Sequence, residues 1–240
     1  MNLLAPPFDT LSGRAWAANL ADLVAAAPDD AVIYRARNTL VRLPGPDGAE
    51  VVVKAFGKGK IWRPGSGSIK ARKSFHAALK LVAAGVGTPA PVAAVNAGGR
   101  GFYACAWVPG CASVWDLHDR RLPDADAENL ARFVARMHEA GVLHRDNTPG
   151  NILLRPRPEG RFDHLVVDCN RVAFGPVGIL AGLKNLVMLE CQDRLLGPYL
   201  AARDADSPLH RKWFAACAAE HRWRWAIKRG TRPLRRKLGM

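Results

Sequence analysis

Residues 144–151 read HRDNTPGN. Upstream, from Asp124 to Gly141, apolar residues recur at helical spacing, and the acidic residues of the first turn suit the positive end of a helix dipole. Directly downstream, Ile152-Leu153-Leu154 has the composition of a short strand. The octapeptide is therefore predicted to be a loop between a helix and a strand, and this setting decides how the rest of the chain is interpreted.

A second apolar strand, Leu165-Val166-Val167, ends at Asp168, after the proline-rich turn RPRPEGR. Phosphoryl transfer needs a carboxylate that orients the acceptor hydroxyl and takes its proton, together with oxygen ligands for the magnesium on the nucleotide phosphates. Asp146 fits the first role, and Asn151 and Asp168 fit the second.

The N-terminal half alternates helical and extended patterns, and Lys54 closes its most valine-rich strand, Val51-Val52-Val53. We predict two domains, residues 1–108 and residues 109–240, with the boundary near Pro109-Gly110. The pattern predicts a helix over 11–27, one strand over 31–43, a turn at 44–50, a strand over 51–56, a helix over 68–85, a hairpin over 91–108 and further helices over 177–203.

The loop and its two strands resemble the catalytic loop of protein kinases, and Lys54 resembles their phosphate-binding lysine. More narrowly, the chain resembles the lipopolysaccharide kinase (Kdo/WaaP, InaA-like) family, a bacterial branch of the protein-kinase-like fold. Four stretches carry this resemblance: Arg37-Asn38-Thr39, Ser68 to Phe75, Gly87-Thr88-Pro89-Ala90-Pro91, and His144 to Asn151 together with Asp168-Cys169-Asn170-Arg171.

The resemblance implies an α+β, bilobal protein-kinase-like fold with a small β-rich N-lobe and a mainly helical C-lobe. It also implies an ATP- and Mg²⁺-dependent transfer of the γ-phosphate to a hydroxyl, in the best-known members that of a sugar of the lipopolysaccharide core. Asp146 is then the catalytic carboxylate, Lys54, Asn151 and Asp168 bind the nucleotide, and Asn151 and Asp168 hold the metal.

Four further residues are expected to support the site. His144 and Arg145 orient the loop backbone and neighbouring carboxylates rather than take part in the chemistry. Asn170 and Arg171 either line the acceptor side or fix the end of the strand.

The sequence departs from the kinase pattern in three places. Kinases hold the strand lysine with a helix glutamate, but residues 51–115 contain no Asp or Glu, and Ser74 stands where that glutamate is expected. Lys54 must then be held by another group, either Asp168 or the nucleotide. Cys169 and Asn170 replace the phenylalanine and glycine that usually follow the metal-binding aspartate, and the loop PGPDG, residues 44–48, lacks the repeated glycines of a phosphate-covering loop.

Composition limits the possible partners and compartment. The chain has 240 residues, 49% of them hydrophobic, and a net charge of +14, which favours an anionic partner. Its five cysteines are scattered without metal or redox spacing, as suits reduced thiols in a cytosol. The N-terminus lacks the pattern of a signal peptide, and no apolar run approaches the ~20 residues of a membrane-spanning helix.

The tail from His210 to Met240 is the most basic part of the chain, with tryptophans among its arginines and a single acid, Glu220. Anionic headgroups attract such clusters, and tryptophan prefers the membrane interface. We hypothesise peripheral attachment to the inner face of the cytoplasmic membrane; the alternative is a helix that packs on the large lobe.

Three other functions compete with a sugar kinase. An aminoglycoside- or choline-type phosphotransferase shares the loop but usually carries acids for cationic acceptors, whereas this chain is basic. A catalytically silent scaffold would not need Asp146, Asn151 and Asp168 together. We rank a nucleic-acid-binding protein last, because no recognisable binding motif accompanies the charge.

Overall fold

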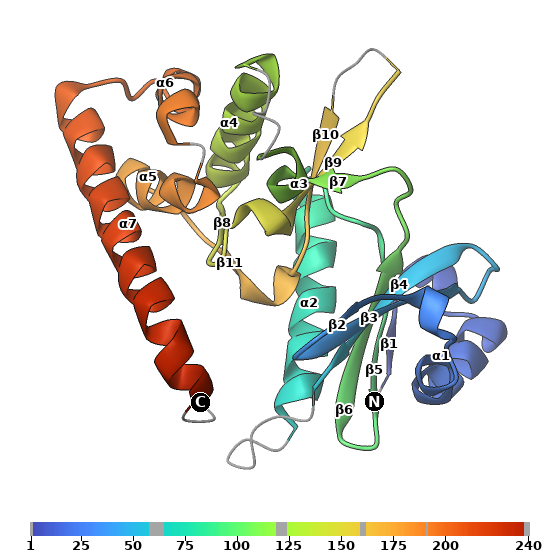
Figure 1. Ribbon diagram of the computed structural model, residues 1–240. Coiled ribbons are helices and arrows are strands. Elements are labelled where there is room, and N and C mark those ends of the chain that lie inside the picture. The colour runs from blue at the N-terminus through green and yellow to red at the C-terminus, as the bar shows by residue number, and fades with distance from the viewer. Residues whose placement is uncertain (1, 58–64, 119–123, 159–161, 191, 238–240) are drawn as a thin grey trace. The chain divides into compact units, whose positions relative to one another are not determined.

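The computed structural model describes residues 2–57, 65–118, 124–158, 162–190 and 192–237, with the side chains of the last helix described as far as Ile227. The described chain forms two compact units (Figure 1). The first unit comprises Met1–Cys111 and Leu153–Val172, and the second comprises Ala112–Ile152 and Ala173–Met240. The first unit thus extends slightly past residue 108 and includes a segment that the sequence placed in the second domain.

The first unit is built on a six-stranded antiparallel sheet with the order β1-β5-β6-β4-β3-β2. Its elements are β1 (Leu3–Leu4), α1 (Leu11–Ala25), β2 (Val32–Arg35), β3 (Asn38–Pro44), β4 (Glu50–Phe56), α2 (Ser66–Ala83), β5 (Pro91–Ala97), β6 (Arg100–Ala106), β9 (Ile152–Pro156), β10 (Phe162–Val166) and the short 3-10 turn Cys169–Arg171.

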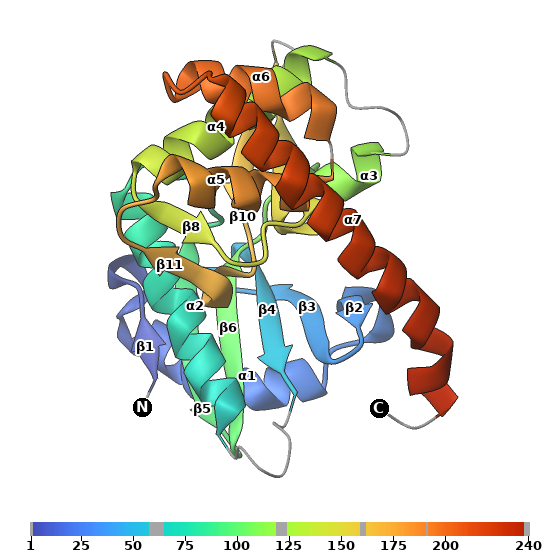
Figure 2. The ribbon, with the colours of Figure 1, turned by 90° about the vertical axis from the view of Figure 1, so that its left-hand side faces the viewer.

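Alternation along β4 decides which face of the sheet each side chain occupies. Val51, Val53 and Ala55 are buried in the core that α1 closes. Because successive strand residues point to opposite faces, Lys54 lies on the face that α2 covers. Figures 1 and 2 show the two helices on opposite sides of the sheet. The strand pattern alone therefore directs Lys54 away from the α1 core.

The predicted single strand over residues 31–43 is wrong, because the chain reverses at Ala36–Arg37 and forms two strands, β2 and β3. The turn carries no Gly or Pro, and a bulge interrupts the pairing between Val32 and Tyr34. The expected helix over 68–85 is present as α2, and Gly85 follows it with a φ of 68° that glycine adopts without strain.

The second unit is mainly helical. It contains β7 (Ala112–Ser113), α3 (Val114–His118), α4 (Asp124–Glu139), β8 (Val142–His144), a 3-10 turn at Pro149–Asn151, β11 (Val172–Phe174), α5 (Ile179–Leu186), a 3-10 turn at Val187–Leu189, α6 (Gln192–Ala202) and α7 (Pro208–Lys237). β8 pairs with β11, α4 packs against α6, and α5 packs against α7.

Helix α4 confirms the strongest helical prediction. Its apolar residues Leu130, Phe133, Val134 and Met137 are buried, and acidic residues occupy its first turn. A β-sheet unit and a helical unit give the expected α+β fold. Among the described residues, no helix is both long enough and apolar enough to span a bilayer.

Candidate active site

Lys54 and Asp168 form an ion pair within the first unit. The Nζ of Lys54 lies 2.6 Å from Oδ1 of Asp168, and their side chains are only 17% and 22% exposed. The Lys54 ammonium also lies over the ring of Phe56, 5.3 Å from its centroid. Two residues that are 114 positions apart in the sequence are thus brought together, and Asp168 holds the lysine directly.

The end of β10 is fixed by the segment Gly87-Thr88. Val166 donates its N–H to the carbonyl of Gly87, and the hydroxyl of Thr88 donates to the carbonyl of Val166, both at 2.8 Å. A Cβ at Gly87 would lie 2.3 Å from the carbonyl oxygen of His164, so only glycine allows this approach. Gly87 and Thr88 therefore fix the strand end from which Asp168 emerges.

Asp168 itself has left-handed backbone angles, φ 56° and ψ 45°. Aspartate tolerates this region better than most residues, and such conformations cluster at functional sites. The turn Cys169–Arg171 that follows packs against α2. The direction of the Asp168 side chain is therefore set by its left-handed backbone and by the packing of the following turn.

Helix α2 offers no carboxylate to Lys54. Ser74, at the expected position of the glutamate, is fully buried, and its hydroxyl donates to the carbonyl of Lys70 one turn earlier at 3.0 Å. Its polar group is thus satisfied within its own helix. The carboxylate that pairs with Lys54 therefore comes from Asp168 and not from α2.

Two thiols beside this pair are protonated at neutral pH. Burial is the main cause that raises the pKa of Cys169 to about 11 and that of Cys105 to about 12. The Cys169 thiol contacts the carbonyl of Val166 and the hydroxyl of Thr88, at 3.7 and 3.6 Å. Cys169, which stands where kinases have phenylalanine, is therefore a packing residue and not a nucleophile.

The two remaining candidates of the first unit differ in burial. Asn170 is half-buried, and its Oδ1 has no hydrogen-bond partner among the described residues. Arg171 is exposed.

The catalytic-loop candidates lie together in the second unit. The buried ring of His144 accepts the backbone N–H of Asp146 on Nδ1 at 3.1 Å. The side-chain amide of Asn151 donates to the backbone carbonyl of Asp146 at 2.7 Å. Asp146 is thus held at both its backbone N–H and its backbone C=O, and its side chain takes part in neither bond. Arg145, the fourth candidate of the loop, is exposed.

A buried chain of hydrogen bonds supports this loop from behind. Arg203 donates to the hydroxyl of Tyr199 at 3.2 Å, and this hydroxyl lies 2.8 Å from Nδ1 of His138. The Nε2 of His138 lies 3.0 Å from Oδ1 of Asn185, whose Nδ2 donates to the backbone carbonyl of His144 at 2.8 Å. The network connects α6, α4 and α5 to the residue that begins the loop.

The network assigns the tautomer of His138. Because the amide nitrogen of Asn185 is used on His144, its Oδ1 accepts, and Nε2 of His138 must carry the proton. Nδ1 then accepts from the hydroxyl of Tyr199. Gly182 permits this arrangement, since a Cβ there would lie 2.1 Å from that hydroxyl oxygen.

His138 makes the stability of the fold sensitive to mild acid. Burial lowers its pKa from 6.5 to about 4, so protons bind the unfolded chain more readily than the native one in this interval. Neutral His138 contributes about 3 kcal/mol to the free energy of unfolding above pH 6.5. This contribution is lost as the pH falls toward 4. Measuring the free energy of unfolding in urea between pH 7 and pH 5 tests this.

The matched variant is His138→Gln, which keeps a polar side chain but cannot titrate. We expect it to be less stable than wild type at pH 7 and to show a smaller pH dependence over the same interval. Equal slopes for the two proteins would show that His138 does not remain neutral in the native state.

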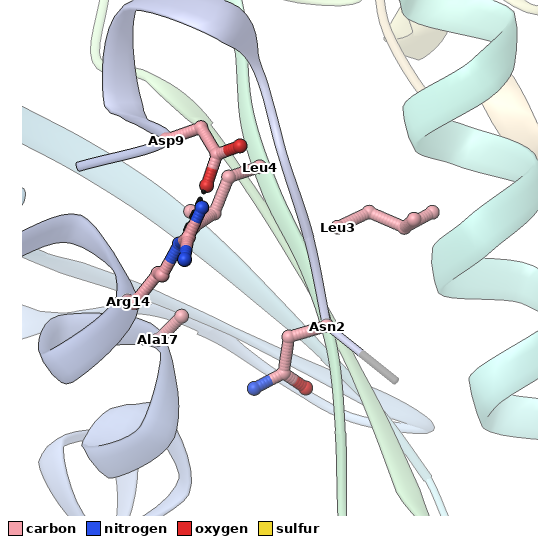
Figure 3. A pocket seen from close by; sticks show the side chains of 6 residues that line it. All are labelled: Asn2, Leu3, Leu4, Asp9, Arg14 and Ala17. Carbon is pink, nitrogen blue, oxygen red and sulfur yellow. Dashed lines mark hydrogen bonds and ion pairs between the residues drawn. The ribbon is translucent and has the colours of Figure 1, made fainter. Parts of the chain in front are cut away.

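A shallow hollow near the N-terminus lies apart from all these residues. It has a volume of about 460 Å³ and is lined by Asn2, Leu3, Leu4, Asp9, Arg14 and Ala17 (Figure 3). Its charged groups already pair with each other, Arg14 Nε to Asp9 Oδ1 at 2.8 Å on the surface. None of the candidate catalytic residues lines it, so we do not assign it to the reaction.

A family model matches the part of the chain that contains these residues. The family model described as "Lipopolysaccharide kinase (Kdo/WaaP) family" matches residues 54–175, just over half of the chain, from Lys54 to beyond Asp168. The chain belongs to the lipopolysaccharide kinase (Kdo/WaaP) family. Membership makes it a kinase, and the match covers both the Lys54–Asp168 pair and the Asp146 loop. No curated protein matches the chain.

Among solved structures, this Kdo/WaaP-family kinase is similar to a Rio2 kinase from Chaetomium thermophilum, a complex with ADP/Mg²⁺ and phosphoaspartate. The TM-score is 0.54 at 15% sequence identity, and the match covers 92% of this chain and 77% of the other. At this identity the likeness concerns the fold, which is that of a protein kinase.

The sequence did not predict the buried hydrogen-bond network that supports the loop of this family member. Asn185 and Gly182 lie in the apolar helix Ile179–Leu186, where a buried asparagine needs polar partners. That incongruity was the available signal. His138 gave none, because a histidine in the last turn of a helix is ordinary.

Proposed function

We propose that this kinase transfers the γ-phosphate of ATP to a sugar hydroxyl, in the lipopolysaccharide core or a similar anionic glycolipid. The observation that carries the proposal is the fixation of Asp146 at both backbone polar groups by His144 and Asn151. In this proposal the Asp146 carboxylate orients a substrate hydroxyl and accepts its proton as the new bond to phosphorus forms.

The proposal assigns the magnesium of the nucleotide to two oxygen-bearing side chains, one from each unit. Asn151 spends its amide N–H on the Asp146 carbonyl, so its Oδ1 is left as a hard ligand, and Asp168 supplies a carboxylate. One or two protein oxygens suffice for Mg²⁺ that is also bound to phosphates. When bound, Mg²⁺·ATP supplies the phosphoryl group and the cation that neutralises its charge. The Rio2 structure, with its ADP/Mg²⁺, supports this choice of cofactor.

Lys54 has two successive partners in this proposal. Without nucleotide its ammonium neutralises Asp168 across 2.6 Å. With nucleotide bound, Lys54 would hold its phosphate oxygens, and the Asp168 carboxylate would hold the metal. The absence of a helix glutamate makes this exchange direct, because no third group is needed to hold the lysine.

The hairpin β2–β3 is the better candidate for covering the phosphates. Kinase lysines of this kind lie on the third strand, after a hairpin whose loop covers the nucleotide. Lys54 lies on β4, which follows β2 and β3 in the sheet. By this analogy the turn Ala36–Arg37, and not Pro44–Gly48, is proposed to cover the phosphates. Arg37 is exposed there and brings a charge that glycine-rich loops lack.

An acceptor assay tests the proposal. Purified protein is incubated with γ-labelled ATP, Mg²⁺ and either lipopolysaccharide core oligosaccharide or an aminoglycoside. We expect label on the core sugar and none on the cationic acceptor, in keeping with the +14 charge of the chain. Preference for the aminoglycoside would refute the sugar assignment, and ATP binding without transfer to any acceptor would favour the scaffold.

A further inference from the structure

Helix α7 uses one side to pack on its own unit. Phe214, Cys217 and Ala218 are at most 7% exposed, and the helix contacts α5 and the turn Val187–Leu189. The spacing of three and four residues places these side chains on one face. The second half of the helix continues past α5 (Figure 1).

The opposite side of α7 carries large apolar side chains in the open. Leu209 is 70% exposed, Trp213 41%, Trp223 65% and Ile227 46%. Their helical spacing aligns them along one outward stripe, named here the outer stripe. Trp213 donates its indole N–H to the carbonyl of Leu180 at 3.1 Å, so it borders the packed side. The four side chains form two exposed apolar pairs, Leu209 with Trp213 and Trp223 with Ile227, each pair one helical turn apart. Grouped apolar side chains of this kind, unlike single ones, mark an interaction surface.

Basic residues flank the outer stripe. Arg222 and Arg224 lie on either side of Trp223 and are exposed. Glu220, the one acid within the stripe, is countered by Arg224 at 2.7 Å and by Lys184 at 3.8 Å. In the sequence from Pro208 to Met240, ten Lys and Arg accompany this single acid, a large part of the net charge of +14.

We propose that α7 docks the protein on an anionic lipid bilayer, with the outer stripe inserted among the acyl chains and the flanking arginines at the headgroups. The combination of tryptophans, aliphatic residues and flanking cations is that of a helix lying in a membrane interface. Nucleic-acid bases could stack on the tryptophans, but binding to nucleic acid would not account for the exposed aliphatic residues Leu209 and Ile227. The inference does not depend on the phosphotransfer chemistry, since none of these residues belongs to the catalytic loop.

Vesicle co-sedimentation of the full chain tests the proposal. The probes are vesicles of phosphatidylcholine alone and of phosphatidylcholine with phosphatidylglycerol, at low and high salt. We expect the wild-type protein to bind the anionic vesicles. The double variant Trp223→Ala with Ile227→Ala should have a partition coefficient at least about tenfold lower than that of wild type. For Arg222→Gln the partition coefficient should be about fivefold lower. The matched control is Ile33→Ala with Tyr34→Ala on β2, residues 48% and 54% exposed, which should bind like wild type.

Each arm has an outcome that overturns the proposal. Failure of the wild-type protein to bind anionic vesicles removes the lipid surface as partner. Unchanged binding of the Trp223/Ile227 variant removes the outer stripe, and equal loss in the Ile33/Tyr34 control makes the effect unspecific. The Trp223/Ile227 variant is also tested for binding to single-stranded RNA. If it loses RNA binding but keeps vesicle binding, the helix binds nucleic acid and not lipid. ATPase activity of the Trp223/Ile227 variant should equal that of wild type, which separates this result from the proposed function.

Discussion

Replacing Asp146 with asparagine is expected to lower kcat for phosphate transfer by about 10²- to 10⁴-fold, the usual contribution of a positioned general base. Asparagine has the same shape but cannot take a proton. The bonds from His144 and Asn151 use the backbone of residue 146, so they survive the substitution. The loop should therefore keep its conformation while losing its chemistry.

Two measurements separate this effect from unfolding. The rise in Tm with Mg²⁺·ATP should be the same for wild type and Asp146→Asn, because the proposed nucleotide ligands are Lys54, Asn151 and Asp168. Asp124→Asn, on the surface of the same unit, is the matched control and should keep full turnover. Turnover that persists in the Asp146 variant would show that another group orients and deprotonates the acceptor.

The sequence predicted the parts of the site that depend on local order. The octapeptide at 144–151 could be placed because a helix and a strand of recognisable periodicity enclose it. The Ala36–Arg37 reversal could not, because the turn has no Gly or Pro and the apolar pattern runs through it. The pairing of Lys54 with Asp168 was one of two options, since local sequence does not state which groups meet across 114 positions.

The polar support of the loop lies beyond local sequence for a different reason. His138, Asn185 and Tyr199 come from three helices, and each is unremarkable on its own element. Their meaning arises only when packing buries them together, where every donor must find an acceptor. Periodicity reports which face of a helix is buried, but it does not report which polar groups meet inside.

Replacing Asp168 with asparagine is expected to remove the Mg²⁺ dependence of nucleotide binding and to abolish measurable transfer. Asparagine also tolerates the left-handed backbone at this position, so the effect is one of charge. Lys54 would lose its counter-ion in a mostly buried place, which costs about 1–3 kcal/mol of stability without nucleotide. Phosphates restore a partner for Lys54, so the variant should still gain stability from ATP alone.

The measurement is a thermal shift with ATP, with and without Mg²⁺, on wild type, Asp168→Asn, Lys54→Met and the double variant. Saturation of wild type at about a hundred times Kd adds about 2.7 kcal/mol of stability, and in Asp168→Asn we expect Mg²⁺ to add nothing to the effect of ATP. If Lys54 and Asp168 are partners, the double variant loses less stability than the two single losses together. A Mg²⁺ effect that is undiminished in Asp168→Asn would place the metal on other ligands, and strictly additive losses would mean that the ion pair contributes nothing to the resting state.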